Sequence, residues 1–468
     1  MFSLKTLLKY SLIPLLLQAL TAHAAITVTK IAQGCAANHS LFLKSDGSLW
    51  AMGDNSSDQL GDGTFYNAYR PEEIVAASVV AIAAGGYHSL FLKSDGSLWA
   101  MGGNGSGELG DGTWIYLTSQ PEEIVASGVT AIAAGKFHSL FLKCDGSLWA
   151  MGDNSSGELG NGTYSSNEPF DGTNKPVKIV TSGVTAIAAG DFHSLFLKSD
   201  GSLWAMGDNQ FGELGDGTYG VAQYYYATNQ PEEIVASNVT AIAAGGHHSL
   251  FLKSDGSLWA MGWNGRGQLG DGTSDSTNRP EEIVASNVIA ISAGENHSMF
   301  IKSDGSLWAM GYNAEGQLGD GTYNLATNQP EEIVASGVTA IAAAATHSLF
   351  LKSDGSLWAM GEGSVGQLGD GFGPFNYSET ILPEQICPSP QPVLVETISS
   401  NTNLQFTATC GFGGNFYLLA GTNLAQPLSQ WIPVWTNVIA DSYNNNFSVT
   451  LTNAVNSGSQ QFFILQSQ

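Results

Sequence analysis

The residues of this sequence best suited to chemistry recur at regular intervals. Seven histidines open near-identical copies of His-Ser-Leu-Phe-Leu-Lys-Ser-Asp-Gly-Ser-Leu-Trp-Ala-Met-Gly, and successive copies begin 49 to 55 residues apart. They are His39, His88, His138, His193, His248, His297 and His347. A zinc site gathers three or four ligands around one ion, whereas these histidines belong to separate repeats. We therefore expect structural histidines that hydrogen-bond the backbone at a turn, with neither a metal site nor a cofactor.

The other candidate groups also repeat, which favours structural roles for them. A serine directly follows every repeated histidine, and its recurrence in every copy indicates scaffold rather than a nucleophile with its own base. The segment Asp54–Gly63 holds enough oxygens for calcium but lacks the spacing and terminal glutamate of an EF-hand loop, so turn formation is the better interpretation. The repeated tryptophans are expected to pack between neighbouring units. We predict a protein that is not an enzyme.

Each copy contains four β-like segments. In the second copy these are Val80–Ala84, His88–Lys93, Leu98–Gly102 and Glu122–Val125, and Ser94–Ser97 forms a tight hairpin between the second and third. Four antiparallel strands per unit form one blade, and a period near 50 residues is typical of propellers. Seven copies therefore predict an all-β, seven-bladed β-propeller, which closes without long exposed edges.

The repeat resembles that of the regulator of chromosome condensation family. The matching features are a small-residue strand, Gly, His-Ser, an Asp-Gly hairpin, an aromatic strand ending in Gly, and then Asn and Gln/Glu-Leu-Gly, over about Ile26 to Ile386. The chain departs from the usual pattern by placing Trp two residues earlier in the third strand, with Met before the Gly. The resemblance implies the propeller fold, found in a nuclear exchange factor for a small GTPase, in a plant ultraviolet photoreceptor and in secreted propellers that inhibit β-lactamases.

The ends of the chain predict export and a second domain. Residues 1–24 combine Lys5 and Lys9 with an apolar stretch and a small-residue junction at Ala24, as in a cleaved signal peptide. We expect a propeller over 25–387, a proline-rich linker over 388–392 and a small β-sandwich over 393–468, resembling the terminal modules of secreted bacterial repeat proteins. The mature protein is expected to be secreted, periplasmic or on the cell surface, with no transmembrane anchor.

The net charge narrows the possible partners, and the cysteine content leaves the disulfide pairing open. The formal net charge is -25, and removing the two leader lysines makes it -27. Because nucleic-acid affinity depends on neutralising phosphates with Lys and Arg, we expect no nucleic-acid partner. Four cysteines at positions 35, 144, 387 and 410 allow three complete pairings, and the sequence favours none.

The positions that vary between copies point to a binding surface. They lie after each Gly-Thr and just before each repeated histidine, and an antiparallel blade places both at the same end, opposite the near-constant hairpins. Such variable loops on a constant framework are typical of recognition surfaces. The candidate ligand-binding residues are Tyr66, Tyr87, Trp114, Tyr116, Phe137, Tyr164, Phe192, Tyr224, Tyr225, Tyr226 and Tyr323. We predict an exported protein-binding module; the alternatives are glycan binding through the aromatic loops and a hydrolase or lyase that uses the central channel.

Overall fold

A computed structural model gives the architecture. It describes residues 27–32, 34–164, 172–219, 227–371 and 379–386 in full, together with the backbone of six strands between 395 and 467. The predicted leader at 1–24 and linker at 388–392 lie outside the described residues. The described elements are all β-strands, and no helix with the length and hydrophobicity to cross a membrane is found among them.

Twenty-eight strands form seven sheets of four. The first strands are β1 (Val28–Ile31), β5 (Val79–Ala84), β9 (Val129–Ala134), β13 (Val184–Ala189), β17 (Val239–Ala244), β21 (Val288–Ala293) and β25 (Val338–Ala343). The second strands are β2 (His39–Lys44), β6 (His88–Lys93), β10 (His138–Lys143), β14 (His193–Lys198), β18 (His248–Lys253), β22 (His297–Lys302) and β26 (His347–Lys352). The third strands are β3 (Leu49–Gly53), β7 (Leu98–Gly103), β11 (Leu148–Gly152), β15 (Leu203–Gly207), β19 (Leu258–Gly262), β23 (Leu307–Tyr312) and β27 (Leu357–Glu362). The fourth strands are β4 (Ala68–Val75), β8 (Leu117–Val125), β12 (Thr173–Val180), β16 (Thr228–Val235), β20 (Thr277–Val284), β24 (Ala326–Val334) and β28 (Glu379–Ile386).

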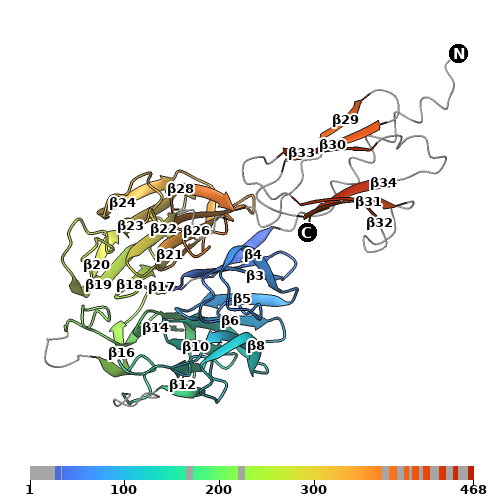
Figure 1. Ribbon diagram of the computed structural model, residues 1–468. Coiled ribbons are helices and arrows are strands. Elements are labelled where there is room, and N and C mark those ends of the chain that lie inside the picture. The colour runs from blue at the N-terminus through green and yellow to red at the C-terminus, as the bar shows by residue number, and fades with distance from the viewer. Residues whose placement is uncertain are drawn as a thin grey trace.

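Each blade is a meander of four consecutive antiparallel strands, and the blades follow one another around a ring (Figure 1). The first strands line a central cavity, and the fourth strands form the largely exposed outer edges. In blade 2, His88 pairs with Gly102 and Ser89 pairs with Ala84, so the ends of three strands meet on one side of the disc. We call this side, with its first-to-second and third-to-fourth connections, the loop face. The opposite side is the hairpin face.

The repeated hairpins follow from local chemistry. In blade 2 the Asp95 carboxylate accepts hydrogen bonds from the backbone N–H of Ser97 at 2.9 Å and from its hydroxyl at 2.6 Å. Gly96 adopts a φ of 80°, which side-chain-bearing residues rarely do. The Gly96 carbonyl accepts the N–H of Val129, the first residue of the next blade's first strand, at 3.0 Å. The hairpin therefore both turns the chain and joins two blades.

The hydrophobic core lies between the blades. One cluster combines Leu41 and Leu49 of blade 1 with Phe91 and Met101 of blade 2, and Trp99 packs against it. Within blade 2 the rings of Phe91 and Trp99 stack with centroids 6.0 Å apart. Equivalent clusters occupy the other blade junctions. The prediction that the tryptophans pack between blades is confirmed.

The ring closes between blades 7 and 1. Strand β1 contacts β25 and β26, and Val28, Phe42 and Met52 share a core cluster with residues of blade 7. The seven-bladed propeller predicted from the repeats is confirmed.

Beyond the propeller, six strands form two three-stranded antiparallel sheets. They are β29 (Val395–Ser399), β30 (Asn403–Thr409), β31 (Asn415–Gly421), β32 (Ile432–Val438), β33 (Asn446–Leu451) and β34 (Phe462–Ser467). The sheet orders are β29-β30-β33 and β32-β31-β34. A β-sandwich built from these sheets stays a prediction.

The fourth strand differs from the sequence expectation. It begins in blade 2 at Leu117 rather than at Glu122, so the end of the predicted variable loop belongs to a strand. Pro121 is accommodated because the strand forms an outer edge and the ladder is irregular between Ala100 and Gly102. As a result Glu122 pairs with Ala100 in the middle of the strand and does not lie at the strand end on the loop face.

Candidate functional site

A closed ring of hydrogen bonds joins the seven repeated histidines to serines. The His88 Nε2 atom lies 2.8 Å from Ser139 Oγ of the next blade, and His347 of blade 7 is bonded to Ser40 of blade 1 at 2.8 Å. The other five pairs repeat this contact at 2.8 to 2.9 Å. The expectation of a structural histidine is confirmed, but its partner is a serine side chain of the following blade and not the backbone.

The serine hydroxyl fixes the state of the histidine. Ser139 Oγ donates its single proton to the carbonyl of Glu108 at 2.8 Å, so it must accept its other hydrogen bond from His88 Nε2–H. The Nδ1 atom of His88 is buried without a hydrogen-bond partner. Burial lowers the pKa of the ring histidines to about 3 or 4. At neutral pH these histidines are uncharged links between blades.

An irregular loop in blade 1 crosses the top of the central cavity. Gly34 lies so close to the Ala84 carbonyl that a Cβ would clash with it. Cys35 reaches blade 4, where its Sγ lies 3.6 Å from Asp191 Oδ1 and 3.8 Å from the Ala189 carbonyl. Burial, with the charge of Asp191, holds the pKa of the Cys35 thiol well above its usual value. Cys35 and Cys144 are free thiols, and Cys387 and Cys410 lie outside the described residues.

The cavity below this loop has a volume of about 320 Å³ and is lined by first-strand residues of all seven blades. Most of the lining residues are alanine and isoleucine; Lys30 and Cys35 are the ionisable residues among the described lining residues.

Aromatic side chains form an arc around the mouth of the cavity on the loop face. The rings of Tyr87 and Phe137 stack at 5.4 Å, Phe137 and Phe192 lie 6.3 Å apart, and Phe192 and His247 lie 6.2 Å apart. These residues occupy the position directly before the repeated histidine in blades 2 to 5. The structure therefore brings together three of the predicted binding residues, and adds His247 to them.

Two further rings extend the arc and were not expected from the sequence. Phe211 meets His247 edge-on at 5.2 Å and Trp263 at 6.0 Å. They stand in the turns after β15 and β19, where aligned copies carry Ser57 or Asp54. Aligning the copies residue by residue reveals both aromatic substitutions, and this is the signal that could have found them.

Charged groups lie beside the aromatic arc. Lys136 and Asp191 form an ion pair at 2.9 Å. Burial alone lowers the pKa of Lys136, but Asp191 and Glu295 outweigh burial and raise it. Burial and Asp191 raise the pKa of Glu295. The mouth therefore combines stacked rings with a partly buried, mixed charge cluster.

The outer candidates are exposed but do not all play the same part. Tyr66 and Tyr116 are 68% and 72% exposed, and Trp114 and Tyr323 are also exposed. The Tyr164 hydroxyl donates to the carbonyl of Ala227 in the neighbouring blade, so this side chain also ties two loops together. The remaining candidates, Tyr224, Tyr225 and Tyr226, lie outside the described residues.

The turns after the third strands are held by their own side chains. In blade 1, Asn55 Nδ2 donates to Asp62 Oδ1 at 3.1 Å, and Asp62 accepts the N–H of Thr64 at 2.7 Å. Asp54 accepts the N–H of Ser56 at 3.1 Å. The prediction that Asp54–Gly63 performs turn chemistry is confirmed by these bonds.

One side chain of this turn is either Gln or Glu and lies directly under the arc. In blade 1, Gln59 Nε2 donates to Asp54 Oδ2 at 3.0 Å. Blade 3 has Asp153 and Glu158 at these positions, and burial together with Asp153 raises the pKa of Glu158 to about 8. Two carboxylates thus face each other in blade 3 where blade 1 has an amide and a carboxylate.

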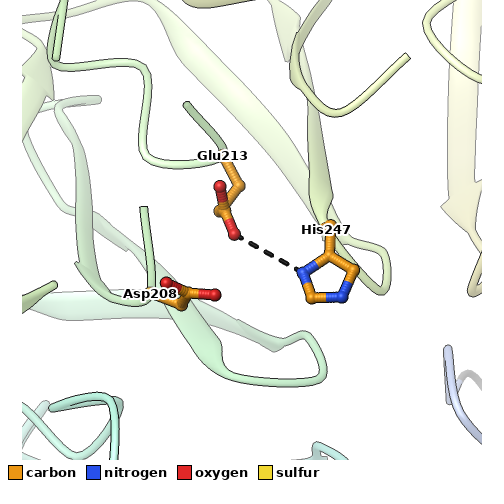
Figure 2. A group of neighbouring side chains, drawn as sticks. All are labelled: Asp208, Glu213 and His247. Atoms are coloured by element: carbon orange, nitrogen blue, oxygen red, sulfur yellow. Dashed lines mark ion pairs between the residues drawn. The ribbon is translucent and has the colours of Figure 1, made fainter. Parts of the chain in front are cut away.

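Blade 4 repeats this carboxylate pair and adds an imidazole from blade 5. Asp208 and Glu213 are buried, and His247 Nδ1 lies 3.6 Å from Glu213 Oε1 (Figure 2). Burial and Glu213 raise the pKa of Asp208 to about 6. Burial alone lowers the pKa of His247, but Glu213, Asp191 and Asp208 outweigh it and raise it. We call these three residues the Asp-Glu-His cluster.

Sequence comparisons agree with the architecture. Residues 118–422 match the family described as RCC1-like domain, and residues 28–59, 79–108 and 46–92 match the regulator of chromosome condensation (RCC1) repeat. The chain belongs to the RCC1-like family. RCC1-like propellers are a protein-interacting or regulatory fold.

Curated relatives share short segments with this RCC1-like chain. The X-linked retinitis pigmentosa GTPase regulator homolog of Caenorhabditis elegans is 43% identical over 88 residues, which is 19% of this chain and 6% of the relative. The ultraviolet-B receptor UVR8 of Arabidopsis thaliana is 28% identical over 102 residues, 21% of this chain and 22% of the receptor. The chain thus spans less than a quarter of the length of either relative.

Solved structures share the fold over most of the chain. Human WBSCR16 superposes with a TM-score of 0.65 at 22% identity, covering 74% of this chain and 95% of that one. Prp20p of Saccharomyces cerevisiae, described with its binding to Gsp1p and histones, gives 0.64 at 24% identity, covering 74% and 87%.

Proposed function

We propose that this chain is an exported, non-enzymatic propeller that binds a protein partner through its loop face. The observation that carries the proposal is the aromatic arc at the mouth, which runs without a break from Tyr87 through Phe137 and Phe192 to His247. Stacked rings held by a rigid scaffold provide contact area at a small cost in conformational entropy.

The contrast between adjacent positions supports a recognition role. The repeated histidine is the same in every blade and is buried in the ring of hydrogen bonds. The residue directly before it differs between blades, being aromatic in blades 2 to 4 and polar in blades 1, 6 and 7. Because the joint between blades does not depend on this position, its side chain is available for selection by a partner.

The charge of the chain bears on the class of partner. With a formal net charge of -25, the protein repels a polyanion and attracts a basic or neutral surface. Protein partners are also named for a structural relative: Prp20p is described with Gsp1p and histones and bound to Kap60. We therefore favour a protein over a nucleic acid.

A hydrolase or lyase in the central channel receives less support. The loop that carries Cys35 crosses the mouth, and the described lining of the cavity below is mostly alanine and isoleucine. Glycan binding through exposed rings such as Tyr66 and Tyr116 is the second candidate, because aromatic faces stack on sugars.

The proposal is tested with the mature chain, residues 25–468, as bait in extracts of the producing cell's envelope and medium. Tyr87→Ala and Tyr116→Ala are expected to weaken capture of the partner by more than about 1 kcal/mol, or roughly fivefold, at one or both positions. Protease treatment of the extract should abolish capture, whereas capture that survives protease but not periodate would assign a glycan instead.

The control belongs on the hairpin face. Ser94→Ala is suitable because Ser94 is exposed there, whereas Lys93 is unsuitable because its Nζ lies 3.6 Å over the Trp99 ring. Equal losses on both faces would contradict a loop-face site. Export is checked separately by N-terminal sequencing of protein recovered from the periplasm or medium, which is expected to begin at Ala25.

A further inference from the structure

We infer that Asp208, Glu213 and His247 form a binding site for a divalent transition-metal ion, for which zinc is the natural probe. One ligand atom of each residue lies within 4.8 Å of the others. Asp208 follows β15, Glu213 belongs to the turn after it, and His247 precedes β18 of the next blade. The site therefore bridges blades 4 and 5, and it does not depend on the proposed protein partner.

The first argument is an unpartnered oxygen. Glu213 is 0% exposed, and its Oε2 accepts the N–H of Phe211 at 2.8 Å. Its other oxygen, Oε1, is buried without a hydrogen-bond partner and points toward the imidazole (Figure 2). A buried carboxylate oxygen without a donor is costly, and a cation removes that cost.

The second argument is the spacing of the atoms. The 3.6 Å between His247 Nδ1 and Glu213 Oε1 exceeds the roughly 2.7–3.2 Å of a hydrogen bond. Two ligand atoms each about 2.1 Å from one zinc ion and at a tetrahedral angle lie about 3.4 Å apart. The pair is thus spaced as two ligands of a shared ion, with only a small side-chain adjustment.

The third argument comes from the other blades. In blade 1 the amide of Gln59 donates directly to Asp54 at 3.0 Å. A hydrogen bond therefore joins the two side chains that correspond to Glu213 and Asp208. Blade 3 has the two carboxylates, Asp153 and Glu158, but Phe192 stands where blade 5 supplies His247. Within the described blades, the nitrogen ligand joins the carboxylate pair at the junction of blades 4 and 5.

The donor set selects the class of metal. Imidazole nitrogen suits zinc and its neighbours in the first transition row, whereas calcium requires six to eight oxygens. Three protein ligands leave one position of a four-coordinate ion for water. The imidazole is held between the rings of Phe192 and Phe211, and its 28% exposure gives an ion access from solvent.

Zinc binding by the tag-free mature chain tests the inference. The protein is treated with EDTA, carries Cys144→Ser to remove the exposed thiol of the described propeller residues, and is titrated with zinc at neutral pH by calorimetry. We expect one bound equivalent, lost in His247→Phe, which copies the arrangement of blade 3. Glu213→Gln, which copies blade 1, is expected to weaken binding at least about tenfold. Cobalt should give visible absorption bands that disappear in the same variants.

A gain of binding provides the matched control. Phe192→His places an imidazole beside Asp153 and Glu158 and is expected to add a second equivalent of zinc. Thermal melting establishes that each variant is folded. The inference is overturned if the parent chain binds no zinc, if His247→Phe binds it with unchanged affinity, or if folded Phe192→His still binds a single equivalent.

Discussion

His247 and His248 are adjacent in the chain but belong to two different layers of the propeller. His248 lies in the buried ring, bonded to Ser298 at 2.9 Å, and burial lowers its pKa to about 3. His247 lies one residue closer to the mouth, where neighbouring carboxylates raise its pKa. The ring layer is the same in every blade and joins the blades. The mouth layer varies and carries the candidate sites, so repetition separates structural from functional positions here.

Acid should disrupt the ring layer more than any single substitution. An unfolded chain protonates its histidines below about pH 6.5, whereas burial holds the pKa of the ring histidines at about 3 or 4. The stability that the neutral histidines contribute is therefore present above about pH 6.5 and is lost as the pH falls toward 4.

Buried acids oppose this trend only in part. Burial raises the pKa of Glu108 to about 7, and that of Glu158 reaches about 8, so both hold protons in the folded state that the unfolded chain releases. Seven histidines outweigh them. Urea unfolding between pH 8 and pH 5 should show a steep fall in the free energy of unfolding below pH 6, with the same slope in the mouth variant Tyr87→Ala. A constant free energy over this range would contradict neutral ring histidines.

Ser139→Ala should give the next largest effect, about 3 kcal/mol in the free energy of unfolding. The substitution leaves two buried groups without a partner, His88 Nε2–H and the Glu108 carbonyl, and each costs about 1–3 kcal/mol. Chemical denaturation measures the loss, and the exposed Ser94→Ala serves as its control. A loss no greater than that of the control would show that the ring of histidine–serine hydrogen bonds does not contribute to stability.

Gly96→Val should cost about 2 kcal/mol by straining a hairpin. Gly96 has a φ of 80°, and a Cβ there would lie 3.0 Å from the backbone nitrogen of Gly128. Gly96→Asn should cost less, because asparagine tolerates positive φ better than valine. Thermal melting compares the two variants. A loss of partner binding without a change in melting would instead place recognition on the hairpin face.

Tyr116→Ala should have the smallest effect on stability, within about 0.5 kcal/mol, because the side chain is 72% exposed. The same denaturation assay measures this. A large destabilisation would show that the variable loops of the loop face also hold the fold together.

The sequence was sufficient to predict the fold because turn residues in each repeat mark where its strands end. The second strand of blade 2 runs from His88 to Lys93 in both prediction and structure, since the Asp-Gly hairpin ends it sharply. The fourth strand is longer than the predicted Glu122–Val125 because it begins at Leu117 and includes Pro121, which an outer-edge strand accommodates.

The site was only partly predictable. Tyr87, Phe137 and Phe192 were identified from their variability, but their mutual stacking depends on the spacing between blades. Glu213 and His247 are 34 residues apart in different blades, so their approach follows from blade geometry and from no local motif. The histidine–serine bond was missed for the same reason, because each histidine bonds the serine of the following repeat.

The direction of the ring bonds has a consequence for how such a chain can change. Every serine both accepts from the preceding blade's histidine and donates to a carbonyl of that blade, including Ser40 with His347 and Gln367 across the closure. All seven joints therefore have the same direction. Each blade presents its histidine and a backbone carbonyl to the following blade, and its serine to the preceding blade. Because every blade meets its neighbours through the same histidine–serine bond, a blade with a different mouth residue can replace another while this bond is kept.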